Sequence, residues 1–292
     1  MISDSDRKKL EAARKYFECL GRISLIVTEA SNYVTFRAMY PKLLDEIDKA
    51  ENEIKDIEKI AGALSIPDIH IIENLYYYAK YYVEAMKDFQ SWNFDAGALE
   101  KAIGFFKNYL TQAREVLEWL ESQELLTKED IQEIQEEWKK VEPMLKTSLE
   151  ALEAFKWNSK AGANMALGNF NEGAIAFEKV MSIISKSGNK ELNPLYGITE
   201  ANLWFARAMG YQYEDGNFLE AAKTFEKSSK LFERLAAREE DPFSKGTYQA
   251  YNTLCEKRAS LCIALYNKIE TRRDYKEIRE EMNAIRRSFW RT

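Results

Sequence analysis

The sequence has very little histidine, cysteine, proline or glycine. Its 292 residues include one histidine (His70), three cysteines, 5 Pro and 12 Gly. One histidine excludes a metal site built on two histidines, and an odd, sparse set of cysteines excludes a disulfide scaffold. So little proline and glycine excludes collagen-like and low-complexity chains. What remains is a chain rich in ordinary apolar and charged residues, which can bury a large core.

Long apolar runs are also absent from the start of the chain. Residues 1–6 carry no secretory signal, and the apolar run at 23–27 is far shorter than the roughly 20 residues that span a membrane. Lys+Arg number 42 and Asp+Glu 48, so the net charge is −6. Such a balance disfavours nucleic-acid binding unless a local basic face exists. We therefore expect a cytoplasmic protein with no membrane span.

Motifs that carry chemistry are missing as well. The sequence has no phosphate-binding loop, no dinucleotide fingerprint and no nucleophile elbow. His70 precedes Glu73, which reverses the Glu-x-x-His order of di-iron bundles. Many carboxylates have a lysine four residues on, as Glu136 has Lys140, which is typical of solvated helix faces. We expect no enzymatic activity, no catalytic residue, no metal and no cofactor.

Apolar residues recur at steps of three and four along most of the chain, which predicts an all-α fold. A first helix is predicted over 6–39, and Pro41 is predicted to open a second. Pro143 is predicted to kink or break a later helix. Asp95 and the pair Thr127 and Asp130 are predicted caps. Further helices are predicted to begin at 67, 171, 194, 219, 247 and 274, with loops at 186–194 and 239–246.

The helical pattern divides into three predicted segments. Residues 1–66 form an N-terminal helical hairpin that serves as a cap or an oligomerisation element. Residues 67–150 hold central long helices, of which the tyrosine-rich one after residue 67 is expected to contact neighbours on more than one face. Residues 151–292 hold repeated helix pairs. One continuous domain is the alternative to this division.

Two segments of the C-terminal half share a glycine, an asparagine and a phenylalanine, followed by a small residue and a second phenylalanine. They are Gly168, Asn169, Phe170, Gly173 and Phe177, and Gly216, Asn217, Phe218, Ala221 and Phe225. We expect the glycine to end a helix in a left-handed conformation and the first phenylalanine to fill the space between two helices. The small residue then lets the two helix backbones approach. Partial copies are seen at 92–97 and, more faintly, from Cys262 through Tyr275.

This pattern resembles the turn and second helix of the tetratricopeptide repeat over about residues 150–290. The resemblance implies antiparallel hairpins stacked in a right-handed superhelix, whose concave face binds a peptide or protein. By position, it places the following residues on that face: Phe155, Asn158, Gly162, Met165, Leu203, Ala206, Gly210, Tyr213, Ser260, Ile263, Asn267 and Glu270. The clear copies lie 48 residues apart rather than 34, and Ala161 and Met209 replace the family's first-helix glycine.

Two functional hypotheses follow. The first is a non-enzymatic scaffold that binds a peptide or protein partner. The alternative is a regulatory protein that binds a small ligand, or binds nucleic acid or phosphate through a C-terminal region with eight basic and five acidic residues over 268–292. Its arginines are Arg272, Arg273, Arg279, Arg286, Arg287 and Arg291. The interleaved acids weaken this alternative. The long N-terminal helices also leave a homodimer open.

Overall fold

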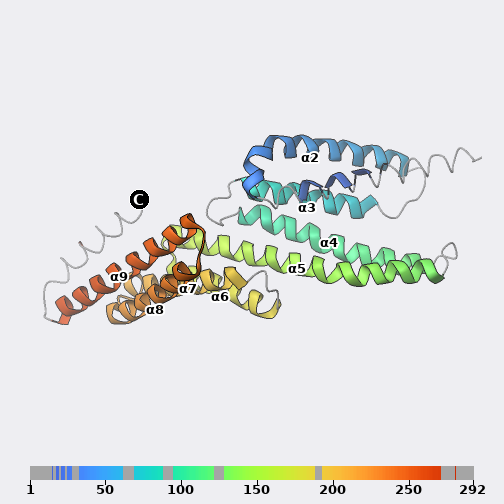
Figure 1. Ribbon diagram of the computed structural model, residues 1–292. Helices are drawn as coiled ribbons and strands as arrows, with labels where there is room; N and C mark the ends of the chain where they lie inside the picture. Colours follow the sequence, from blue (N-terminus) through green and yellow to red (C-terminus); the bar gives the residue numbers. More distant parts are fainter. Residues whose placement is uncertain are drawn as a thin grey trace, which may run out of the picture. The chain divides into compact units, whose positions relative to one another are not determined.

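The computed structural model describes residues 15, 18, 19, 21–23, 25–27, 33–61, 69–87, 95–121, 128–187, 193–270 and 280. These residues are helical apart from short turns and helix ends, and no strand occurs among them, so the predicted all-α class is confirmed for this part of the chain. The helices are α2 (Tyr33–Ala61), α3 (Ile69–Lys87), α4 (Ala96–Glu121), α5 (Lys128–Leu167), α6 (Phe170–Ser187), α7 (Asn193–Tyr213), α8 (Phe218–Arg238) and α9 (Pro242–Glu270) (Figure 1).

The chain divides into two compact units, residues 1–159 and residues 160–292. The predicted segments 1–66 and 67–150 both fall within the first unit, because one apolar core joins residues from Cys19 to Leu152. The predicted repeat segment begins shortly before the second unit. That unit has a core of its own, built from residues between Phe170 and Leu265.

Two prolines lie inside helices. This corrects the prediction that Pro41 opens a helix and excludes a break at Pro143, where a kink stays a prediction. Helix α2 begins at Tyr33 and continues through Pro41, and α5 continues through Pro143. An interior proline costs about 3 kcal/mol, because its ring removes one backbone hydrogen bond and crowds the preceding turn. Burial offsets this cost in α2, since Leu43, Ile47 and Ala50 directly after Pro41 are buried. Figure 1 shows α2 bent near its N-terminal end, as an early proline would cause.

The first unit is held together by apolar and aromatic side chains on consecutive helices. On α2 the apolar residues at steps of four and three are all buried: Leu43, Ile47, Ala50, Ile54 and Ile57. The tyrosines of α3 contact both neighbours, as predicted: the Tyr76 hydroxyl donates to Glu51 of α2 at 2.8 Å, and the Tyr78 ring stacks on Phe106 of α4 at 4.6 Å. On α4 and α5, Lys107 pairs with Glu153 and Arg114 with Glu142. The falling partner numbers make these two helices antiparallel.

Consecutive helices of the second unit are also antiparallel. Between α7 and α8, the Ser228 hydroxyl donates to the Ala201 carbonyl at 2.9 Å, and the Phe205 and Phe225 rings lie 5.7 Å apart. Between α8 and α9, Ser229 donates to the Asn252 side chain at 2.6 Å. Helix α7 therefore buries one side against α6 and another against α8, and α8 lies in the same way between α7 and α9 (Figure 1).

The sequence predicts two turns, each with a left-handed glycine followed by a phenylalanine that fills the space between two helices. We call these turns elbows, and both are confirmed in the second unit. Gly168 and Gly216 have φ values of 82° and 68°, the left-handed conformation that glycine adopts without strain. Phe170 and Phe218 directly after them are only 1% and 6% exposed. A Cβ added to the buried Gly173 would lie 3.1 Å from the Met165 sulfur. The small residue thus lets α6 approach α5, as the sequence predicts.

Helix caps explain where several helices begin. Asp95 caps α4 as predicted, since its carboxylate accepts from the backbone N–H groups of Gly97 and Ala98 at 2.8 and 2.9 Å. Helix α9 begins earlier than predicted, at Pro242, which replaces most of the predicted loop 239–246 with helix. Here the Asp241 carboxylate accepts from the Ser244 N–H at 2.8 Å, and proline suits the first helical position.

Some predictions lie outside the described residues. They concern Thr127, the partial repeat at 92–94, the loop at 188–192 and the helix over 274–290.

Replacing an elbow glycine and replacing a glycine inside a helix by alanine should change the stability of the second unit in opposite directions. A Cβ added at Gly216 or at Gly246 meets nothing within 4 Å, so only backbone conformation separates the two. Gly216→Ala should destabilise the second unit by about 1 kcal/mol, because alanine is strained at positive φ. Gly246→Ala, inside α9, should stabilise it by about 0.5–1 kcal/mol. Urea unfolding followed by circular dichroism measures both, and equal effects would contradict the elbow geometry.

Candidate partner-binding site

The residues predicted to bind a partner come from both compact units and differ in exposure. Phe155 and Asn158 belong to the first unit, where the half-buried Phe155 packs against the core. Met165 and Tyr213 are half-buried and pack against the core of the second unit. Ser260, Ile263 and Asn267 are exposed on α9. The last three are the ones that the structure brings together on one accessible face.

Leu203 and Ala206 are core residues, which corrects their assignment to a binding face. They are 5% and 0% exposed. Both share a face of α7 with Gly210, at helical steps of three and four, and a Cβ at Gly210 would collide with Asn171 of α6. This face of α7 is therefore turned toward α6. The resemblance places Leu203 and Ala206 on an open face, whereas α7 is a central helix covered on two sides.

Tyr213 holds α7 against α9 through a buried arginine. Its hydroxyl accepts a hydrogen bond from Arg258 Nη1 at 2.8 Å, and its ring lies 5.6 Å from that of Phe170. Arg258 is 4% exposed and also donates to the Gln212 side chain at 3.3 Å. A buried guanidinium needs such acceptors to offset its lost hydration. Tyr213 is thus a structural residue as much as a surface one.

Sequence reasoning missed Arg258, although a signal is present. Arg258 follows Cys255 by three residues and precedes Cys262 by four, so it stands inside the buried stripe of α9. A charged residue in an apolar helical stripe indicates a buried polar contact. What the sequence does not reveal is that its acceptors come from α7.

The face of α9 that is turned away from the core is the candidate site. We call it the α9 face and define it by Glu256, Ser260, Ile263 and Asn267, which follow one another at steps of three and four residues and are all exposed. Ile263 is 39% exposed and is the apolar residue of this face. The face offers one apolar anchor between small polar side chains, which suits contact with a peptide.

A test of the Tyr213 contact compares two tyrosines of α7. Tyr213→Phe removes the acceptor of a buried charged donor and should lower the free energy of unfolding by about 1–3 kcal/mol. The control is Tyr211→Phe, because the Tyr211 hydroxyl makes no hydrogen bond within the described ranges. That control should change stability by less than about 0.5 kcal/mol. Equal losses in urea unfolding would show that Arg258 does not depend on the Tyr213 hydroxyl.

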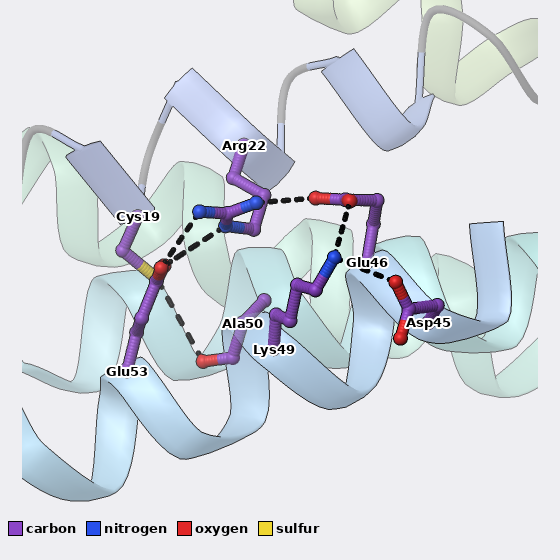
Figure 2. A network of polar contacts seen from close by, with 7 residues as sticks. All are labelled: Cys19, Arg22, Asp45, Glu46, Lys49, Ala50 and Glu53. Atoms are coloured by element: carbon purple, nitrogen blue, oxygen red, sulfur yellow. Dashed lines mark hydrogen bonds and ion pairs between the residues drawn. The ribbon is translucent and has the colours of Figure 1, made fainter. Parts of the chain in front are cut away.

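The first unit contains an ion-pair network around Arg22 (Figure 2). The guanidinium donates to Glu53 from Nε at 3.1 Å and from Nη2 at 2.8 Å, and Nη1 donates to Glu46. Lys49 bridges Glu46 and Asp45 at 3.1 and 2.6 Å. Arg22 thereby fastens the N-terminal helical residues to α2. The planar guanidinium donates through two nitrogens to one carboxylate and through a third nitrogen to the other, a paired geometry that the single ammonium nitrogen of a lysine cannot supply.

The network sets the protonation of its members. Hydrogen bonds from Lys49 and Arg22 lower the pKa of Glu46. Burial, with help from the Glu53 charge, raises the pKa of the neighbouring Cys19 thiol to about 12. Burial likewise raises the pKa of Cys255 to about 11 and that of Cys262 to about 12. All three thiols are therefore protonated near neutral pH and are poor nucleophiles.

The lowered pKa of Glu46 predicts a pH dependence of stability. Below about pH 4.5, Glu46 becomes protonated in the unfolded chain while it stays ionised in the folded protein, because its pKa is lower there. The free energy of unfolding therefore falls as the pH falls through this window. Glu46→Gln should cost about 1 kcal/mol at pH 7 and flatten the dependence. Urea midpoints from pH 7 to pH 3 measure this. The control is Glu84→Gln, an exposed site without an ion pair among the described residues, and an identical slope in all three proteins would contradict the prediction.

The remaining candidates are a metal site, His70, the C-terminal arginines and a membrane span. In the parts of the chain that the structure describes, no group of three or more His, Cys, Asp or Glu side chains is placed to hold a metal ion. The side chain of His70 and the five arginines Arg272, Arg273, Arg279, Arg286 and Arg287 lie outside the described residues. None of the helices in the described ranges is both long enough and apolar enough to cross a membrane.

Comparisons of the chain with protein-family models, with curated proteins and with solved structures found no match.

Proposed function

We propose that the second unit is a tetratricopeptide-like helical array that binds a segment of a partner protein without changing it chemically. The observation that carries this proposal is the recurrence of one elbow. In both copies a glycine with positive φ precedes a buried phenylalanine, and a small buried residue and a second buried phenylalanine follow at the same distances. Equal packing at equal spacing is the mark of a repeated unit.

The order of the helices supports the same proposal. The elbow at Gly168 joins α5 to α6, and the elbow at Gly216 joins α7 to α8, so α9 occupies the position of the first helix of a third pair. First helices line the binding face in this type of array. On α7 the corresponding positions are buried, whereas on α9 they are exposed. The α9 face is therefore the part of the array that we assign to the partner.

The chemistry of the α9 face favours a peptide over a small ligand. Ile263 offers an apolar anchor, and the Ser260 hydroxyl, which donates to the Glu256 carbonyl at 3.1 Å, can still accept a hydrogen bond from a peptide N–H. Ile263 is 39% exposed, so covering the rest of its side chain contributes at most about 0.6–1.2 kcal/mol to the contact.

The test compares two neighbouring positions of α9. Ile263 and Ala264 are both exposed, but they point about 100° apart around the helix. Ile263→Asp should abolish capture of the partner from cell extract, because it places a charge at the anchor. Ala264→Asp introduces the same charge beside the face and should retain the partner. Circular dichroism and thermal unfolding confirm that both variants remain folded.

Photo-crosslinking makes the result specific. A photoreactive residue at position 260 should crosslink the same partner, whereas one at Glu233, exposed on α8, should not. If the partner is a second copy of this chain, the crosslinked product will have twice its mass. Equal capture by the Ile263→Asp and Ala264→Asp variants would contradict the assignment.

A further inference from the structure

Helix α8 carries a basic stripe along its outer side. Five cations follow one another at helical steps of four, three, four and four residues: Lys223, Lys227, Lys230, Arg234 and Arg238. All five are exposed, whereas Phe225, Ser228 and Phe232 on the opposite side of α8 are buried. At 1.5 Å per residue, the stripe extends for about 22 Å.

The contacts of α8 leave most of this charge available. Lys223 pairs with Glu220 of the preceding turn at 2.7 Å. Within the described ranges, Lys230, Arg234 and Arg238 make no ion pair. The helix dipole favours Arg238 in the last turn of α8, but its effect falls off within one turn and does not reach Lys223, Lys227 or Lys230. Local stability therefore does not explain the stripe.

Trp204 of α7 lies beside the stripe and occupies one of its lysines. The Lys227 Nζ lies 3.1 Å from the centroid of the half-buried Trp204 ring, and the Arg207 guanidinium lies 4.7 Å from it. Arg207 in turn pairs with Glu178 of α6. In the absence of a partner protein, the Lys227 ammonium therefore makes a cation–π contact with the Trp204 ring. A carboxylate brought close to this ammonium would compete with the ring.

We propose that the basic stripe binds an acidic α-helix of a partner protein, with a carboxylate on each turn of that helix. The cations are spaced about 4.5–6 Å apart, which matches carboxylates at steps of three and four residues on a facing helix. Glu220, Glu226 and Glu233 lie beside the stripe and confine its positive charge to a narrow line, which suits the spaced carboxylates of one helix face better than the continuous phosphates of a nucleic acid. This surface lies on α8 and does not depend on the assignment of the α9 face.

The test uses the full chain and synthetic peptides. The probe is an alanine-rich peptide with glutamates at steps of four, three, four and four residues, so that they form one helical stripe. The control peptide has the same composition with its glutamates spread around the helix. Titration at about 0.15 M salt should show at least tenfold tighter binding of the striped peptide. Tryptophan emission should change on binding, and the change should be lost in Trp204→Phe.

Matched charge variants locate the surface. Lys223→Glu, Lys227→Glu and Lys230→Glu together should weaken binding of the striped peptide at least tenfold. The control reverses three other exposed lysines, Lys42, Lys245 and Lys257, which changes the net charge equally and should weaken binding less than twofold. Should the first variant fail to fold, replacing the same three lysines by glutamine must still weaken binding several-fold.

Three results would overturn the proposal. The first is equal affinity for the striped and the control peptide, and the second is an equal loss in both charge variants. Either would show that net charge alone attracts the peptide. The third is tighter binding of an oligothymidine of the same charge than of the striped peptide, which would assign the surface to phosphates instead.

Discussion

Two residues with positive φ determine how the second unit folds. An ordinary residue at Gly168 or Gly216 would resist the left-handed turn, and without that turn the chain could not reverse and bring Phe170 or Phe218 into the core. Each elbow is completed by a contact that closes it. At the first, the Glu214 carboxylate accepts from the backbone N–H groups of Phe170 and Asn171 at the start of α6, although it lies at the end of α7. Glu214, which directly follows α7, thus caps the N-terminus of α6 in the preceding helix pair.

The sequence predicts what depends on near neighbours. The stripe of α2, the Asp95 cap and both elbows follow from spacing within a few residues, and the structure contains them. Predictions are wrong where contacts between residues far apart in the sequence determine the structure. Pro41 breaks the local rule for a helix, but burial of the residues after it outweighs the lost hydrogen bond. Leu203 and Ala206 are buried because α6 covers them. The cap formed by Glu214 joins residues 44 positions apart. A pattern of neighbouring residues cannot predict either contact.

The same reasoning applies to the binding surfaces. The exposure of Ile263 follows from the order of the helices, because α9 is the last helix in the described part of the array. The contribution of Tyr213 could not be read from position alone, since the buried Arg258 occupies its hydroxyl. The α8 stripe is visible in the sequence as five cations at helical steps, but only the contacts with α7 and α9 show that it lies on the outer side.

Hydrogen exchange tests the central claim most directly. The partner captured by the wild-type chain and lost by the Ile263→Asp variant would be added back to the pure chain, and backbone exchange would be followed with and without it. The account predicts slower exchange in α9 around residues 256–267 and no change in α3 and α4. Protection confined to the first unit, with α9 unchanged, would contradict it.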